Sequence, residues 1–178
     1  MRLALSLMAL LVTIPAAAQD GSTVARRGFW IGFGLGAGSN LTEGFSGTRG
    51  GGAAYLRLGG SVNQQLLIGG EGLTWARREN STTVSQGNTA AVVYFYPSAA
   101  GGLFLKSGLG FANRIARTDI GNTSITRTDV GFGATFGGGV DVQLGENFFL
   151  TPNVDVLVQT ITGTTGGLLL LTVGATWH

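Results

Sequence analysis

The chain has no cysteine and a single histidine among its 178 residues, and these two shortages exclude several kinds of chemistry. Without cysteine there is no disulfide, no thiolate metal ligand and no lipid-modified N-terminal cysteine. A serine hydrolase needs an imidazole beside its nucleophile, and the one histidine, His178, is the last residue. We therefore expect no enzyme activity, no metal site and no bound cofactor.

Charge and long apolar runs are also scarce. After the first residues there is no apolar run of about 18 residues, which excludes a helical membrane protein. Charged residues make up 11% of the chain and the net charge is +2, so we expect no nucleic-acid partner. The composition is nevertheless too apolar for a disordered chain, and the 32 glycines lack the three-residue period of collagen.

The N-terminus has the pattern of a secretory signal. Arg2 precedes an uncharged apolar run at 3–14, and small residues follow at 15–18. The run is too short to cross about 30 Å of hydrocarbon as a helix, which favours a signal over a membrane anchor. We expect a signal peptide at 1–18 and one domain at 19–178.

The rest of the sequence is dominated by a two-residue alternation. In the segment FWIGFGLGAG at 29–38, large apolar residues occupy the odd positions and glycines fill most even ones, and VGFGATFG at 130–137 repeats the pattern. Because side chains on a strand point to alternate faces, one face is apolar and the other is small or polar. The pattern predicts eight strands, at 28–38, 51–62, 66–76, 89–97, 101–112, 128–144, 148–160 and 167–178.

The connections between these strands alternate in length. Those at 39–50, 77–88, 113–127 and 161–166 are longer, and those at 63–65, 98–100 and 145–147 are short. Long loops at one end and short turns at the other are typical of outer-membrane barrels, whose strands need about 9–11 residues to cross. The strand ends near the short turns carry the residues of an expected interfacial girdle: Phe29, Trp30, Tyr94, Phe95, Tyr96, Phe148, Phe149 and Trp177.

These features resemble a known family. The signal, the alternating strands, GGLFLKSGLGF at 101–111 and TVGATWH at 172–178 are similar to the small OmpA/OmpX-like outer-membrane β-barrels. The resemblance implies an all-β, eight-stranded, antiparallel up-and-down transmembrane barrel in the bacterial outer membrane. It further implies a monomer whose partners are outer-membrane lipid, lipopolysaccharide and the barrel assembly machinery. Family members usually end on an aromatic residue, whereas here His178 follows Trp177. A secreted, lipocalin-like soluble barrel is the alternative fold.

Five charged residues fall inside the predicted strands, and we expect them to form a charge network in the lumen: Arg57, Glu71, Lys106, Asp141 and Asp155. An unpaired charge at mid-strand would be costly, so Arg57, Lys106, Asp155 and Glu71 are expected to pair. If Glu71 points inward, Leu67, Leu73 and Trp75 also do; a bulge at 69–70 is the alternative.

Glycines are expected to face bulky residues across the lumen. In an eight-stranded ring the first strand lies opposite the fifth, which would set Gly32, Gly34 and Gly36 against Phe104 and Lys106. Such packing would fill a narrow lumen. A glycine-lined pore is the alternative.

Arginines are frequent in the predicted surface loops. We hypothesise that Arg77, Arg78, Arg114 and Arg117 contact lipopolysaccharide, because arginine binds phosphate bidentately. Ordinary solvated charge is the competing interpretation. Asp119 and Asp129 share one loop and could form a carboxylate pair for acid–base work, but solvated charge is favoured for them as well.

The sequence thus predicts a non-enzymatic outer-membrane barrel with a side-chain-filled lumen. Its expected role is in envelope structure, adhesion or surface contact. A narrow porin or a barrel that transports hydrophobic solutes is the alternative.

Overall fold

A computed structural model describes residues 26–41, 49–121 and 123–178, so the predicted signal at 1–18 lies outside the described residues. The strands are β1 (Phe29–Asn40), β2 (Arg49–Ser61), β3 (Leu66–Glu79), β4 (Thr82–Phe95), β5 (Leu103–Ile120), β6 (Thr123–Val140), β7 (Val142–Gln143), β8 (Phe148–Ile161) and β9 (Thr164–Trp177). Within those ranges there is no helix long and apolar enough to span a membrane.

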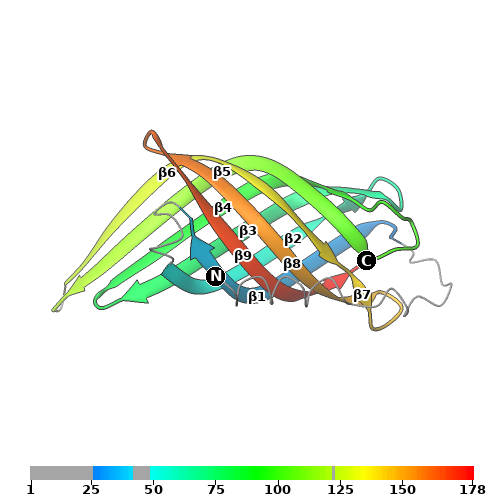
Figure 1. The fold of residues 1–178 in the computed structure, drawn as a ribbon, viewed down its shortest axis with the longest axis horizontal. Coiled ribbons are helices and arrows are strands. Elements are labelled where there is room, and N and C mark those ends of the chain that lie inside the picture. The colour runs from blue at the N-terminus through cyan, green and yellow to red at the C-terminus, as the bar shows by residue number, and fades with distance from the viewer. Residues whose placement is uncertain (1–25, 42–48, 122) are drawn as a thin grey trace, which may run out of the picture.

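The strands close into a barrel (Figure 1). Each long strand pairs antiparallel with its neighbour in the chain, β6 pairs with β8, and β9 returns to pair with β1. The two-residue strand β7 continues β6 and pairs with the same neighbour, β8. β6 and β7 therefore count as one strand of an eight-stranded wall. The predicted eight-stranded antiparallel barrel is confirmed.

A proline explains the interruption between β6 and β7. Pairing of β6 with β8 ends at Gly139 and Asn153, and pairing of β7 with β8 begins in the same register at Val142 and Leu150. Pro152 lies in the unpaired stretch of β8 between them. Proline has no N–H to donate to a sheet ladder. Asp141, the residue between β6 and β7, donates its N–H to the carbonyl of Gly102 on the opposite side.

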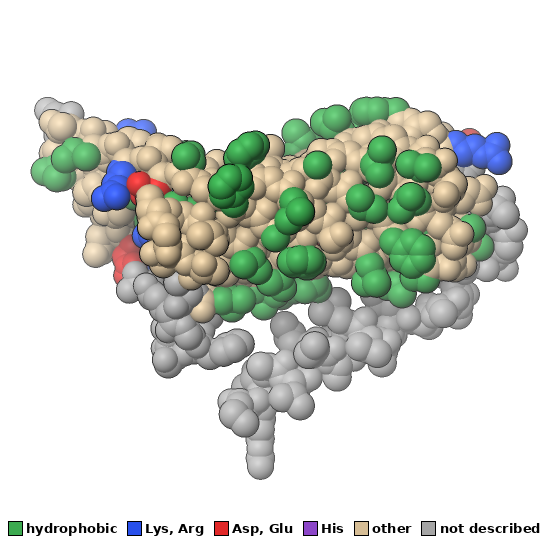
Figure 2. Space-filling view, turned by 90° about the horizontal axis from the view of Figure 1, so that it is seen from above, with side chains coloured by type: hydrophobic (Ala, Val, Ile, Leu, Met, Phe, Trp, Pro, Cys, Tyr) green, Lys and Arg blue, Asp and Glu red, His purple; other side chains and the backbone are tan. Residues whose placement is uncertain are grey.

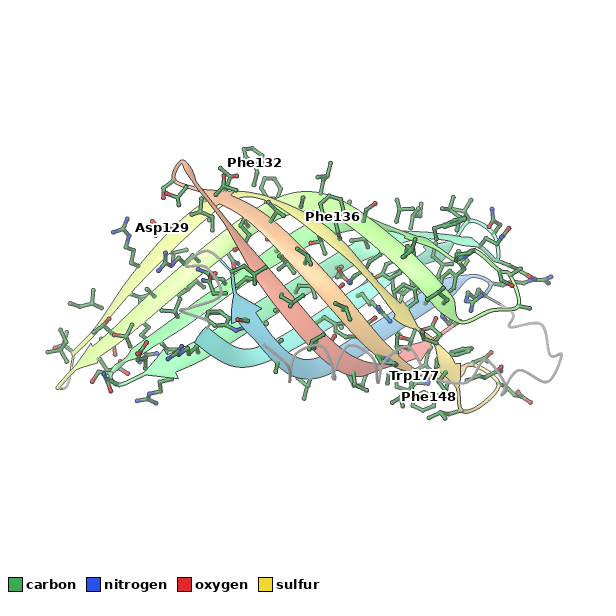
Figure 3. The ribbon with its side chains drawn as sticks, viewed as in Figure 1. Asp129, Phe132, Phe136, Phe148 and Trp177 are labelled. Carbon is green, nitrogen blue, oxygen red and sulfur yellow. The ribbon has the colours of Figure 1, made fainter. Side chains whose placement is uncertain are left out.

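The apolar face of the strands is the exterior. Phe33, Leu105 and Phe132 are 51%, 57% and 74% exposed, whereas Arg57, Lys106 and Asp155 are buried. Figure 2 shows apolar side chains spread along the wall, with charged side chains gathered at the two ends. Phe132 points away from the barrel in Figure 3. An apolar outside around a charged inside is the arrangement of a barrel that spans a membrane, not of a soluble barrel.

The register of β3 is regular around Glu71. Arg57 pairs with Glu71, and the pairing continues without a skipped residue to Ser61 opposite Leu67. Glu71, Leu67, Leu73 and Trp75 are therefore all buried, and no bulge occurs at 69–70.

Three predicted long loops are wrong in extent. The segments 77–88 and 113–127 are mostly strand, with turns at Asn80 and Gly121, and 161–166 contains only a short turn at Thr162 and Gly163. The turn residues have positive φ values, which glycine and asparagine tolerate best. The apolar face stops where these strands leave the membrane, so alternation could not reveal their outer halves. Most of the loop at 39–50 lies outside the described residues.

The predicted aromatic girdle divides into two layers. Its outward half consists of Phe29, Phe95, Phe148 and Trp177, and Trp177 packs against Phe148 with ring centroids 4.8 Å apart (Figure 3). Its other half is buried in the lumen and consists of Trp30, Tyr94, Tyr96 and Phe149. Neighbouring aromatics on one strand must point to opposite faces, which is why a single girdle was wrong.

Glycines in the lumen accommodate bulky residues of adjacent or next-but-one strands, not of opposite ones. A Cβ at Gly34 would collide with the ring of Tyr55, its partner on β2, and one at Gly174 would collide with the Tyr55 hydroxyl. A Cβ at Gly32 would lie 2.8 Å from Nε of Arg57. The expectation that Gly32 and Gly34 face Phe104 and Lys106 across the lumen is therefore wrong.

Candidate functional site: the filled lumen and the blade beyond the rim

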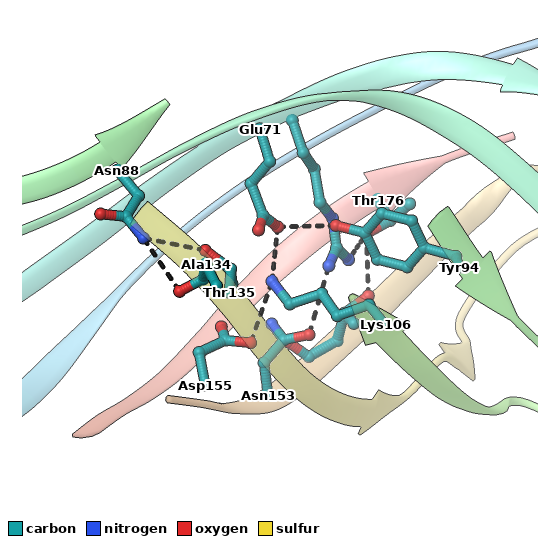
Figure 4. A network of polar contacts seen from close by, with 11 residues as sticks. Glu71, Asn88, Tyr94, Lys106, Ala134, Thr135, Asn153, Asp155 and Thr176 are labelled. Carbon is teal, nitrogen blue, oxygen red and sulfur yellow. Dashed lines mark hydrogen bonds and ion pairs between the residues drawn. The ribbon is translucent and has the colours of Figure 1, made fainter. Parts of the chain in front are cut away.

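A buried charge cluster crosses the middle of the lumen (Figure 4). Lys106 on β5 forms ion pairs with Glu71 on β3 and, at 2.9 Å, with Asp155 on β8. The hydroxyl of Tyr94 donates a hydrogen bond of 2.6 Å to Glu71. All three charged side chains are at most 1% exposed, so the ammonium group holds together carboxylates from strands far apart in the sequence.

Arg57 also lies in the lumen, but it forms no ion pair with any described residue. Its guanidinium donates to Asn153 at 3.2 Å and to Thr176 at 2.8 Å. It also lies over the rings of Tyr55 and Tyr94, at 4.8 and 5.3 Å from their centroids. The expectation that Arg57 would pair with a carboxylate is therefore wrong, because amide, hydroxyl and aromatic groups stabilise this cation.

Asp141 belongs to a separate cluster near the short turns. Its carboxylate accepts hydrogen bonds from Tyr96 at 2.7 Å and Thr151 at 2.8 Å. The imidazole of His178 lies 3.5 Å away and is 2% exposed. The predicted charge network thus consists of two clusters: Lys106 with Glu71 and Asp155, and Asp141 with His178. Arg57 is linked to the second cluster through Thr176 and Thr151.

Sequence reasoning missed several members of these clusters. Tyr94 on β4 and Tyr96, one residue past its end, share an inward parity that alternation could have revealed. Arg26 could not be anticipated, since it precedes the first strand; its guanidinium stacks 3.7 Å from the Tyr96 ring centroid and donates to the carbonyl of Gly101.

Toward the other end, amide and apolar side chains share the lumen. Gln159 donates to Asn88 at 2.8 Å, and Asn88 donates to Thr135 at 3.2 Å. A buried apolar cluster lies at the same levels and contains Ala53, Tyr55, Leu73, Trp75, Leu157, Leu168 and Leu170. Leu157 precedes Gln159 on β8 and Leu73 pairs with Asn88, so amide and apolar side chains fill this half of the barrel interior together.

Beyond the barrel rim, four strands of the wall continue outward as an extension of the same sheet, which we call the blade: 77–79 of β3, 82–84 of β4, 113–120 of β5 and 123–130 of β6 (Figure 1). Pairing between β2 and β3 stops at Ala76, and pairing between β6 and β8 begins only at Gly131. The blade therefore stands outside the closed wall, at the end where outer-membrane barrels carry their extracellular loops.

The outer half of β6 is a free sheet edge. Asp119 on β5 donates its N–H to Ser81 on the β4 side, and successive N–H groups alternate between the two sides of a strand. Thr118, which pairs with Ile125, therefore faces β6. It follows that alternate β6 residues direct their N–H and C=O groups to the free edge: Ser124, Thr126, Thr128 and Val130. No described strand pairs with this edge.

The blade separates the four arginines of the lipopolysaccharide hypothesis into two pairs. Arg77 and Arg114 share the parity of buried Trp75 and Ala112 and lie on the concave, lumen-side face. Arg78 and Arg117 have the opposite parity and continue the outer face of the wall.

The blade carboxylates form local ion pairs. Asp119 lies 3.2 Å from Arg117 and accepts a 2.6 Å hydrogen bond from Ser124, and these contacts lower the pKa of Asp119 below its ordinary value. Asp129 pairs with Arg127 at 3.2 Å on the other face, so the two carboxylates do not form an acid–base pair. Among the described residues there is no group of three potential metal ligands.

Comparison with known proteins gives a likeness in structure only. No protein-family model and no curated protein sequence matches the chain. Neisserial surface protein A superposes with a TM-score of 0.61 at 15% identity, over 84% of this chain and 96% of that one. Ail, the attachment invasion locus protein of Yersinia pestis, solved in complex with the heparin analogue sucrose octasulfate, gives 0.61 at 16% identity, over 85% and 99%.

The N-terminal β-barrel domain of Pseudomonas aeruginosa OprF gives a TM-score of 0.53 at 14% identity, over 85% of this chain and 98% of that one. These neighbours share the closed wall, and the apolar exterior found here suits the membrane that their fold implies. The chain therefore has the fold of the small OmpA/OmpX-like outer-membrane β-barrels, as its sequence predicted.

Proposed function

We propose that this chain is a non-enzymatic surface-contact protein of the outer membrane, in which a filled barrel anchors the blade. The observation that carries the proposal is the free edge of β6 at 123–130. Exposed strand edges bind extended segments of other proteins by β-augmentation, in which backbone hydrogen bonds provide affinity. The similar fold of Ail, whose name refers to attachment and invasion, supports a contact role.

The lumen supports anchoring over transport. Buried charged, amide and apolar side chains fill it along its length, and barrels of eight strands leave room for little besides side chains. We expect the purified barrel to conduct no ions across a planar bilayer.

The edge is tested by removing its donors without changing its side-chain face. Thr126→Pro combined with Thr128→Pro deletes two edge-directed N–H groups, and proline is tolerated on edge strands. The matched control is Thr126→Ala with Thr128→Ala, which keeps both N–H groups. Cells displaying each variant are compared for attachment to surfaces coated with collagen, fibronectin or laminin.

We expect the proline variant to lose most of the attachment and the alanine variant to keep it. Equal attachment by both variants, at equal surface levels of folded barrel, would contradict a role for the edge. Loss in both variants would assign attachment to the threonine side chains instead.

Lipopolysaccharide is proposed as the membrane partner of the outward arginines. Arg78 and Arg117 continue the lipid-facing surface beyond the apolar wall, the level at which outer-leaflet phosphates lie. Arg78→Gln with Arg117→Gln should reduce lipopolysaccharide co-purification, whereas Arg77→Gln with Arg114→Gln should not. Unchanged co-purification with the first pair would leave these residues as ordinary solvated charges.

A further inference from the structure

A cavity of about 430 Å³ opens at the mouth of the barrel, between its apolar plug and the concave face of the blade. Trp75 and Val84 provide its apolar wall, and Gln86 lies beside them. Trp75 also belongs to the buried apolar cluster of the lumen, so the cavity ends where the filled interior begins. Its volume is within the range of roughly 300–1,000 Å³ for small-molecule sites.

The charge around this cavity is unbalanced. Arg77 and Arg114 line it together with one carboxylate, that of Glu79, which lies 3.5 Å from Arg77. Arg114 pairs with Asp129 in the β5–β6 register, but the Asp129 carboxylate is held by Arg127 at 3.2 Å. Within the described part of the chain, Arg114 forms neither an ion pair nor a side-chain hydrogen bond.

Neutral hydrogen-bonding groups occupy the rest of the lining. They are supplied by the β3–β4 turn and by the adjoining strands: Asn40, Asn80, Ser81, Thr82 and Gln86. A guanidinium group binds carboxylate, sulfate or phosphate through two parallel N–H donors. An apolar wall on one side and a guanidinium on the other suit a ligand that has an apolar body and an anionic group.

We propose that the mouth cavity binds a small organic anion, with its charged group on Arg114 and its apolar body against Trp75 and Val84. This site is separate from the β6 edge, so it stands or falls independently of the surface-contact role. It also differs from lipopolysaccharide binding, because Arg114 faces the lumen side of the blade and not the outer face of the wall.

The test uses the folded mature chain in phospholipid nanodiscs that lack lipopolysaccharide, with titration calorimetry as the measurement. Phenyl phosphate is the probe, inorganic phosphate tests the anion alone, and phenol tests the apolar body alone. We expect phenyl phosphate to bind at least about tenfold more tightly than either fragment, since both halves of the cavity contribute. Equal affinity for inorganic phosphate and phenyl phosphate would overturn the proposed apolar contact, and equal affinity for phenol would overturn the anionic one.

Variants locate the site. Arg114→Gln should weaken phenyl phosphate binding by about tenfold or more, the usual effect of losing a charge-assisted hydrogen bond. Arg117→Gln is the matched control, because Arg117 lies on the outer face of the blade, outside the cavity, and it should leave affinity unchanged. Val84→Phe should reduce binding by filling the cavity while leaving Arg114 in place.

Two results would overturn the proposal. Equal loss with Arg114→Gln and Arg117→Gln would mean that binding depends only on the general charge of the blade. Arg114-dependent displacement of phenyl phosphate by lipopolysaccharide added to the nanodiscs would identify the occupant as a lipid headgroup.

Discussion

Charged side chains occur both in the lumen and on the blade, but their surroundings differ. In the lumen, Lys106 is 1% exposed and contacts two carboxylates from other strands. On the blade, Arg117 and Arg127 are 59% and 76% exposed, and each pairs with a carboxylate two residues along its own strand. Exposed pairs contribute little to stability, whereas breaking a buried pair is strongly destabilising. The lumen charges should therefore determine whether the barrel folds. The blade charges should instead determine which molecules bind to its surface.

The largest effect is expected from removing the lumen cation. Lys106→Ala leaves Glu71 and Asp155 buried without a counter-ion, which should lower the free energy of unfolding by about 3–5 kcal/mol. Urea unfolding in detergent micelles, followed by the heat-modifiable gel mobility of folded barrels, measures this change.

The control for this variant neutralises the whole cluster. Lys106→Met combined with Glu71→Gln and Asp155→Asn removes all three charges, so it should recover most of the lost stability. An unfolding midpoint of Lys106→Ala equal to that of the wild type would show that the lumen charges are no more important than those of the blade.

A smaller effect is expected at Arg57. Arg57→Ala removes hydrogen bonds to Asn153 and Thr176, which should cost about 1–3 kcal/mol, but it leaves no buried carboxylate unpaired. It also removes bulk from the plug, so planar-bilayer conductance is measured alongside melting. Arg57→Met retains most of the volume and separates the two effects. Unchanged conductance together with unchanged melting would contradict a plugging role for this residue.

The smallest effect is expected on the blade. The pKa of Asp119 is lowered chiefly by the hydrogen bond from Ser124 and then by Arg117. The contact therefore forms fully above the ordinary carboxyl pKa and is lost as the pH falls through the lowered value. Ser124→Ala should raise the pKa of Asp119 toward its ordinary range, as measured by NMR titration, and leave the unfolding midpoint unchanged. A fall in that midpoint would mean that the blade contributes to folding of the wall.

The same contrast explains what the sequence could predict. Inside the membrane most strands alternate apolar with small or polar residues, so the strands, their facing and the burial of Arg57, Lys106 and Asp155 followed from parity. Parity did not decide the facing of Glu71, which was expected inside because a carboxylate in hydrocarbon is costlier than a leucine in the lumen. On the blade both faces are wet, and polar residues such as Thr126 and Thr128 carry no facing signal. The strands there were consequently interpreted as loops, and the free edge of β6 could not be anticipated.

The sequence also could not predict which side chains contact one another within the lumen. Parity identifies which residues point inward, but not the stagger between strands that sets which of them meet. Arg57 could therefore be placed in the lumen, while its contacts with Asn153 and Thr176 depend on how β2, β8 and β9 are offset.

The seating of Tyr55 over Gly34 and Gly174 has a consequence for evolution within this barrel. Neither glycine can gain a methyl group while the ring occupies its place, so substitutions at 34 or 174 should become acceptable only in lineages where position 55 has shrunk. Related sequences should thus show coupled replacement at positions 34, 55 and 174. A larger residue at 34 or 174 should accompany a smaller residue at 55, so that the summed side-chain volume stays nearly constant.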